Sequence, residues 1–326
     1  MEISVQRMCW QAYPEGKTRY QPLTDNQGNI WKNEIKHNVT AEGIEQCFNN
    51  PPSILYHYKM KKLKISVYFS IFLLASFAIY GFFIEPLKIA VTHFWPDNPV
   101  LKSKLKGKTA IHLSDIHTAG IGSKEKQVLD ILDDIKPDFI FLTGDYVKWD
   151  GDYESAMRFL ASLKAKDGVY AVMGDYDYSN SRKSCRFCHE KGSGRFTDQH
   201  NIKFLKNSKR DVLLSGRKIT IAGVDEKDEE QKYDIKGADI ILSHSPLFFD
   251  TIDQHNNALV LSGDTHGGQI PLPAWIWTIL GYEKNAKYGC GLFTKGNNMM
   301  YVSRGIGTSH LRFRLFRRPE VVVLHF

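Results

Sequence analysis

From residue 109 onward, the chain contains a series of apolar segments that each have an aspartate or a histidine at their exit. Five of them are "TAIHLSD" (109–115), "DFIFLTGD" (138–145), "GVYAVMGD" (168–175), "ADIILSHS" (238–245) and "ALVLSGD" (258–264). Continuous Val, Ile and Leu runs of this length are typical of β-strands that are covered on both faces. A chain with this pattern is therefore restricted to a layered α/β domain.

Helical patterns separate several of these strands. "KEKQVLDILDDI" (124–135) and "YESAMRFLASLKA" (153–165) place their apolar residues at helical spacing. Further strand-like segments follow at 218–225, 299–305 and 320–326. The predicted fold is an α/β domain over residues 109–326, in which two sheets are sandwiched between helices.

Acidic residues and histidines stand at the exits of the strands. They are Asp115, His117, Asp145, Asp175, Asp177, His244, Asp264 and His266. Neighbouring strands of an open sheet end at one crevice, where α/β folds bind their ligands. An aspartate after a strand also caps helices, which is the alternative for any single position. So many carboxylates in one crevice would repel one another, and a bound metal is the simplest compensation.

An uncharged segment near the N-terminus predicts a membrane-spanning helix. The twenty residues from Ile65 to Ile84 carry no charge and show no polar face. As a helix they would cover about 30 Å, the thickness of a hydrocarbon core. Residues 1–64 are interpreted as a polar N-terminal segment, and residues 85–108 as a linker to the domain. A buried helix of a globular protein is the alternative.

Lysines are concentrated on the N-terminal side of this segment. Four of the six residues 59–64 are lysines, whereas Glu85 and Lys88 nearly cancel on the other side. The positive-inside rule then predicts a single-pass protein of the inner or plasma membrane, with residues 1–60 in the cytoplasm and the large domain outside. The formal net charge of +7 suits an anionic substrate or membrane surface, and no nucleic-acid-binding motif accompanies it.

The order of the polar motifs is similar to that of a known family. "DIH", "GD", "GDYD", a later histidine and "GDTHGGQ" follow one another in the chain. They resemble the calcineurin-like metallophosphoesterase superfamily, whose pattern is D-x-H, G-D, G-N-H-D/E, H and G-H-x-H. The resemblance covers residues 109–326, and "IEP", "HGGQ" and "VSRGIGTS" are similar to its membrane-associated bacterial members. It implies a four-layer αββα sandwich and a site for two divalent metals.

The resemblance also implies a role for each polar residue. Asp115, His117 and His266 would hold the first metal, Asp145 would bridge, and Asp175, His244 and Asp264 would complete the second. A water or hydroxide between the metals would attack the phosphorus atom. The implied activity is metal-dependent hydrolysis of a phosphoester or a pyrophosphate.

Three positions depart from the family pattern. Asp175 stands where the family has Asn, and Asp264 replaces the first His of G-H-x-H. The additional carboxylates predict a preference for manganese, or magnesium, over zinc, with iron and zinc left open. Tyr176 replaces a His that helps to protonate the leaving group, and a tyrosine donates a proton without supplying an imidazolium charge. This favours leaving groups that depart readily as anions, as in pyrophosphates and activated diesters.

Four further residues are candidates for contacts with the substrate or the reacting groups. Asp177 would orient Tyr176 or, as the alternative, cap a helix. Arg304 would reach a phosphate, and a surface salt bridge is its alternative. Gly267 and Gly268 would let a bulky ligand approach the backbone amides.

Two amphiphilic segments predict a lipid-linked substrate. "PLPAWIWTILG" (271–281) carries two tryptophans, and "LRFRLFRRP" (311–319) mixes four arginines with Leu and Phe, as at a lipid–water boundary. One family activity that fits is cleavage of UDP-2,3-diacylglucosamine in lipid A synthesis, although that nucleotide is cytoplasmic, opposite to the predicted domain. A non-enzymatic membrane receptor or scaffold that retains the fold is the alternative function.

Five cysteines are too few for a disulfide framework. "CRFCHE" (185–190) has the spacing of a c-type haem attachment or of half a zinc site, to which His189 and His200 could contribute. A reducible local disulfide or a plain loop is the alternative.

Overall fold

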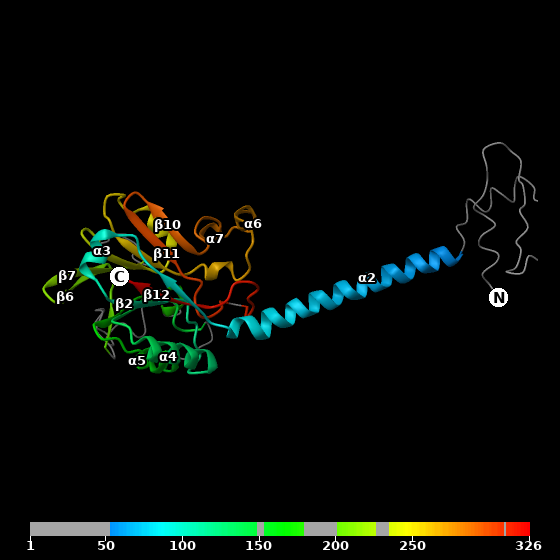
Figure 1. The fold of residues 1–326 in the computed structure, drawn as a ribbon, viewed down its shortest axis with the longest axis horizontal. Coiled ribbons are helices and arrows are strands. Elements are labelled where there is room, and N and C mark those ends of the chain that lie inside the picture. The colour runs from blue at the N-terminus through cyan, green and yellow to red at the C-terminus, as the bar shows by residue number, and fades with distance from the viewer. Residues whose placement is uncertain (1–52, 149–152, 179–200, 226–234, 310) are drawn as a thin grey trace, which may run out of the picture. The chain divides into compact units, whose positions relative to one another are not determined.

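The α/β domain forms one compact unit of the chain. The computed structural model describes residues 53–148, 153–178, 201–225, 235–309 and 311–326. Contacts divide the chain into two units, Met1–Phe69 and Ser70–Phe326, and the second contains the whole domain (Figure 1). The cysteine run at 185–190 and His200 lie outside the described residues.

The first sheet has six strands in the order β1-β12-β2-β3-β4-β5. Its strands are β1 (Ala90–Phe94), β2 (Thr109–Leu113), β3 (Phe139–Thr143), β4 (Gly168–Val172), β5 (Ile202–Phe204) and β12 (Glu320–His325). The strands from β2 to β5 are parallel, and β12 is antiparallel to β2 but parallel to β1. The parallel strands therefore end at the same edge of the sheet.

The second sheet has six strands in the order β10-β11-β9-β8-β7-β6. Its strands are β6 (Ser208–Leu214), β7 (Arg217–Val224), β8 (Ile240–Ser243), β9 (Leu259–Ser262), β10 (Gly291–Lys295) and β11 (Asn298–Val302). The four central strands are parallel, and antiparallel hairpins add β6 and β10 at the two edges.

Strand β3 illustrates why its apolar run has no polar positions. Phe139 and Phe141 point into a core between the two sheets, where they share a cluster with Leu242 of β8. Ile140 and Leu142 point to the other face and join a second core. Because side chains alternate along a strand, a strand that is covered on both faces must be apolar throughout.

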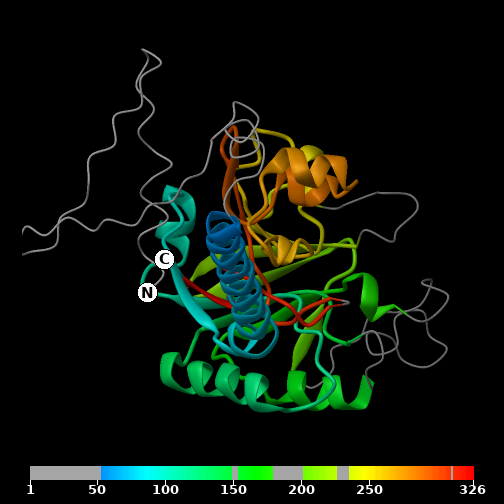
Figure 2. The ribbon, with the colours of Figure 1, turned by 90° about the vertical axis from the view of Figure 1, so that its right-hand side faces the viewer.

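Helices cover the outer faces of the two sheets. The helices α4 (Ser123–Ile135) and α5 (Tyr153–Ser162) bury Val128, Leu132 and Phe159 against the first sheet. The second sheet is covered by the 3-10 helix η5 (Pro246–Asp250), through Phe248 and Phe249. The short helices α6 (Ala274–Ile279) and α7 (Glu283–Lys287) lie on the opposite side of the domain from α4 and α5 (Figure 2). The predicted arrangement of two sheets between helices is confirmed, with a thinner cover on the second sheet.

The predicted linker, residues 85–108, is part of the domain. Strand β1 pairs with β12 from Ala90↔Glu320 to Phe94↔Leu324. The helix α3 (Pro99–Lys104) follows, and its Leu101 is buried in the core between the sheets. The prediction of a linker is wrong because the partner of β1 lies at the far end of the sequence, where local patterns cannot reveal it.

The predicted membrane span, residues 65–84, is helical. Helix α2 (Ser53–Ile79) continues into a π-helical turn, η2 (Tyr80–Ile84), and a 3-10 turn, η3 (Glu85–Leu87). The stretch Met60–Leu87 is long and apolar enough to cross a membrane by length and composition. Its large apolar side chains include Phe72, which is 66% exposed.

Candidate metal centre

Five of the predicted residues converge between the two sheets. Asp115 and His117 follow β2, Asp145 follows β3, His244 follows β8, and His266 lies beyond the end of β9. All five are at most 5% exposed. They form two groups whose donor atoms lie within 4.8 Å of one another, which we call the first ligand group (Asp115, His117, His266) and the second ligand group (Asp115, Asp145, His244).

The donor atoms of the two groups face one another. Nε2 of His117 lies 3.2 Å from Nε2 of His266 and 3.4 Å from Oδ2 of Asp145. The same Oδ2 of Asp145 lies 3.5 Å from Nε2 of His244. Oδ1 of Asp115 lies 3.6 Å from Nε2 of His266. The carboxylate of Asp145 therefore stands between histidines of both groups, where a bridging ligand is expected.

Burial opposes charge on Asp115, His117, Asp145 and His266. It lowers the pKa of His117 to about 3 and raises the pKa of Asp115 to about 6. Burial, and then repulsion by neighbouring carboxylates, also raises the pKa of Asp145 well above its usual value, although His244 opposes the shift. A divalent cation would stabilise ionised carboxylates beside neutral imidazoles, and both are common metal ligands. The residues therefore fit a divalent metal.

The backbone is strained at four of the five cluster residues and at Asp264. Asp115, His117, Asp145, Asp264 and His266 have φ angles of 49°, 43°, 57°, 72° and 53°. Residues other than glycine rarely adopt this left-handed region, and such outliers cluster at functional sites. Backbone hydrogen bonds hold the strained turns together, including those from Asp115 N to the Gly144 carbonyl (3.0 Å) and from His117 N to the Asp145 carbonyl (2.9 Å).

Asp177 holds the turn that carries Asp145. Its Oδ2 accepts hydrogen bonds from the backbone N of Asp145 (2.7 Å) and of Gly174 (2.9 Å), and its Oδ1 accepts one from Tyr146 N (2.8 Å). The bond from Gly174 caps the 3-10 helix η4 (Asp175–Asp177). Of the two predicted roles, capping is therefore the one seen in the structure, and the carboxylate also positions the loop after β3.

Tyr176 lies against the cluster. Its ring meets the His117 ring edge to face, with 4.8 Å between the ring centroids. Its backbone N donates to Oδ1 of Asp145 at 3.0 Å.

Asp175 and Asp264 are each half-buried, and within the described residues neither belongs to a ligand group. The carboxylate of Asp264 forms an ion pair with Lys284 of α7 instead. Lys284 was missed from the sequence, because a lysine in a short polar helix gives no signal.

Arg304 and the two glycines form contacts within the protein. Nη2 of Arg304 donates to Glu320 (2.9 Å) and to Thr92 (3.2 Å), which is the salt-bridge alternative. The amides of Gly267 and Gly268 donate to Thr265, at 3.4 and 2.7 Å. These amides are engaged within their own turn. A Cβ at Gly268 would lie 2.5 Å from the Trp277 ring, so the glycine is required for packing.

Arg314 is a buried organiser of the site that the sequence did not reveal. It is fully buried, and Nη2 donates to the carbonyls of Gly307 (2.6 Å) and Arg304 (2.7 Å). Nη1 reaches the carbonyl of His266 at 3.4 Å. The prediction that the arginines of residues 311–319 lie at a lipid boundary is wrong for Arg314. Its guanidinium is buried because it donates hydrogen bonds to backbone carbonyls of loops, which have no partner in a strand ladder.

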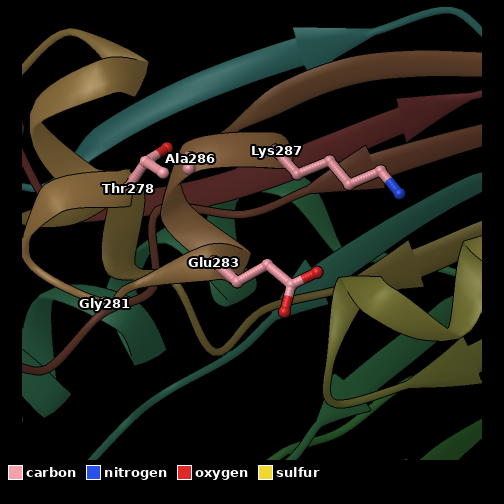
Figure 3. Close-up of a pocket in the computed structure, with 5 residues that line it drawn as sticks. All are labelled: Thr278, Gly281, Glu283, Ala286 and Lys287. Atoms are coloured by element: carbon pink, nitrogen blue, oxygen red, sulfur yellow. The ribbon is translucent and has the colours of Figure 1, made fainter.

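A pocket of about 340 Å³ lies between α6 and α7 (Figure 3). It is lined by Thr278, Gly281, Glu283, Ala286 and Lys287. No member of either ligand group lines it, so this pocket is separate from the metal centre.

Comparison with known proteins identifies the domain. Residues 108–268 match the family model of the calcineurin-like phosphoesterases. YkuE, an uncharacterized metallophosphoesterase of Bacillus subtilis, is 28% identical over 258 residues, which cover 75% of this chain and 87% of YkuE. LpxG of Chlamydia muridarum, a UDP-2,3-diacylglucosamine pyrophosphatase, is 25% identical over 300 residues, or 74% of this chain and 90% of LpxG. A transmembrane protein with a metallophosphoesterase domain from Danio rerio is 29% identical over 249 residues, which cover 68% of this chain and 53% of that protein.

Proposed function

We propose that this chain, which carries a calcineurin-like phosphoesterase domain and is a hydrolase, is anchored in a membrane and cleaves a phosphoester or pyrophosphate bond of an amphiphilic substrate. The observation that carries the hydrolytic part is the buried cluster of three histidines and two aspartates, of which all but His244 have strained backbone angles. Buried groups of this kind, held in rare backbone conformations, are typical of catalytic sites.

The two ligand groups are the proposed site of divalent metal. When bound, such metal activates a water molecule and stabilises charge on the phosphoryl oxygens. Asp145 faces histidines of both groups, and Asp177 fixes the turn that presents it. Tyr176, beside His117, is the proposed proton donor to the leaving group. We propose manganese as the metal. Its preference over zinc depended on Asp175 and Asp264, which within the described residues lie in neither ligand group, so zinc and iron are expected to compete.

Contacts between the candidate span and the domain support a site near the bilayer. The carbonyl of Gly81 accepts a hydrogen bond from Arg314 N (3.0 Å), and Oε2 of Glu85 accepts one from Phe316 N (2.7 Å). The ring of Phe82 packs on Phe313, with 4.7 Å between centroids. Residues 313–316, which contact the end of the span, thus also include Arg314, whose guanidinium reaches the His266 carbonyl.

Exposed apolar side chains support an amphiphilic substrate. In and beside α6, Trp275, Ile279 and Leu280 are 64%, 75% and 53% exposed. Phe316, in the segment that contacts the end of the span, is 60% exposed. Exposed apolar side chains that are gathered in one patch mark a binding surface. The pyrophosphate of a nucleotide-linked acylated sugar, the substrate in the name of the Chlamydia relative, has the required chemistry.

The proposed function predicts metal-dependent turnover. Full-length protein in detergent, stripped of metal and then supplied with Mn²⁺, should hydrolyse a chromogenic phosphodiester. Pyrophosphates that carry acyl chains should be cleaved with a higher kcat/KM than their water-soluble analogues, because the apolar surface binds only the former. Absence of hydrolysis with Mn²⁺, Mg²⁺, Fe²⁺ and Zn²⁺ would contradict the catalytic proposal, and equal kcat/KM values would contradict the lipid-linked substrate.

The lysines before the span predict the orientation of the protein. Four of residues 59–64 are lysines, and the positive-inside rule keeps such a cluster in the cytoplasm. A reporter that is active only outside the cytoplasm should therefore be active when fused after residue 100. The same reporter placed before residue 1 of the full-length chain is the control and should be inactive. The reverse pattern would place the domain in the cytoplasm, on the side where a nucleotide-linked lipid is available.

A further inference from the structure

The turn after β9 is fastened to helix α7 by three side-chain contacts. The carboxylate of Asp264 forms an ion pair with Nζ of Lys284. Nδ2 of Asn285 donates to the carbonyl of Thr265 at 2.8 Å, and the hydroxyl of Thr265 donates to the carbonyl of Gly289 at 2.6 Å. The ion pair is therefore part of a docked interface between α7 and the turn that bears His266.

Asp264 contributes to the cluster through its backbone. Its N–H lies 3.0 Å from Oδ1 and 3.1 Å from Oδ2 of Asp115, so that it supports a carboxylate shared by both ligand groups. Its side chain turns to Lys284 instead and, within the described part of the chain, lies in neither group. A cation that used this carboxylate would have to displace the ammonium group or tolerate its like charge.

We infer that Asp264 is the counter-ion of Lys284 and not a metal ligand, so that the centre binds one divalent cation tightly and a second only weakly. This rests on the proposed function, which assigns metal to the cluster. Lys284 provides a fixed positive charge beside the centre, on the side where a second cation would need Asp264. The tight cation is held by the first ligand group together with Asp145.

Removing the ammonium should create a stronger second site. We expect full-length protein in detergent to bind one Mn²⁺ tightly, as measured by electron paramagnetic resonance of free Mn²⁺ during titration. In Lys284→Met, the released carboxylate should tighten the second Mn²⁺ by at least about tenfold, the lower end of the effect of residues adjacent to metal ligands. Lys287→Met is the matched control, because Lys287 also belongs to α7 but pairs with the surface residue Asp250 at 2.7 Å. It should titrate like the wild type.

Two further variants test whether Asp264 is responsible. Asp264→Asn should keep the tight Mn²⁺, and in the Lys284→Met background it should remove the gain at the second site. Lys284→Arg preserves the ion pair and should keep a weak second site. Two equally tight Mn²⁺ ions in the wild type, or loss of the tight ion in Asp264→Asn, would overturn this inference and leave the proposed hydrolase intact. Wild-type protein that binds no Mn²⁺ would overturn both.

Discussion

Replacing Asp145 with Asn is expected to lower kcat/KM by about 10³-fold, because metal-assisted catalysis of this kind is worth several kcal/mol and each 1.36 kcal/mol is a factor of ten. Oδ2 of Asp145 lies 3.4 Å from His117 and 3.5 Å from His244, so the charge that is removed serves both ligand groups. The amide oxygen of Asn can still accept the hydrogen bond from Tyr176 N. The fold should therefore survive, and bound metal should fall together with turnover.

Metal content and hydrolysis of the purified variant check this expectation, and circular dichroism verifies the fold. Asp130→Asn, which changes an exposed aspartate of α4, is the matched control and should behave like the wild type. Unchanged turnover and metal content in Asp145→Asn would mean that the buried cluster is not the catalytic metal site.

Replacing Arg314 with Met is expected to lower the free energy of unfolding by about 3 kcal/mol, because buried carbonyls would lose their donors. Nη2 of Arg314 serves Gly307 and Arg304, and Nη1 serves Arg317 at 3.0 Å. Burial lowers the pKa of Arg314 to about 10, which leaves the guanidinium charged at neutral pH. A methionine fills much of the same volume but donates no hydrogen bond.

Thermal unfolding of full-length protein in detergent measures this loss, which corresponds to a decrease in Tm of roughly 6–12 °C for a domain of this size. Arg312→Met is the control, because Arg312 lies two residues earlier on the surface and should change stability by less than about 0.5 kcal/mol. If Arg314→Met unfolded at the temperature of Arg312→Met, the buried guanidinium would not be supporting the turns around the metal centre.

The ends of the strands could be predicted because their signals are local. The strand runs before Asp115, Asp145 and His244 are continuous in sequence, and parallel strands of one sheet necessarily end at the same edge. The convergence of both sheets followed from the family resemblance, which the match over residues 108–268 confirms.

The remaining features depend on contacts between distant residues. The partner of Asp264 is twenty positions away in a helix with no apolar pattern, so that a carboxylate expected to bind metal could not be distinguished from one that pairs with a lysine. Arg314 stands among Leu and Phe, a composition that suits a lipid boundary and a protein core equally, and only its carbonyl partners decide between them.

The place of β12 between β1 and β2 determines when the first sheet can be completed. Strand β1 is made by residues 90–94, but its neighbour comes from residues 320–325. At a ribosomal rate of about 5–20 residues per second, β1 waits roughly 10–45 s for this partner to be synthesised. Pairing over such a separation is also slow because the intervening loop must close. Completion of this sheet therefore comes late, and until then the edge of β2 is open to chaperones and to other chains.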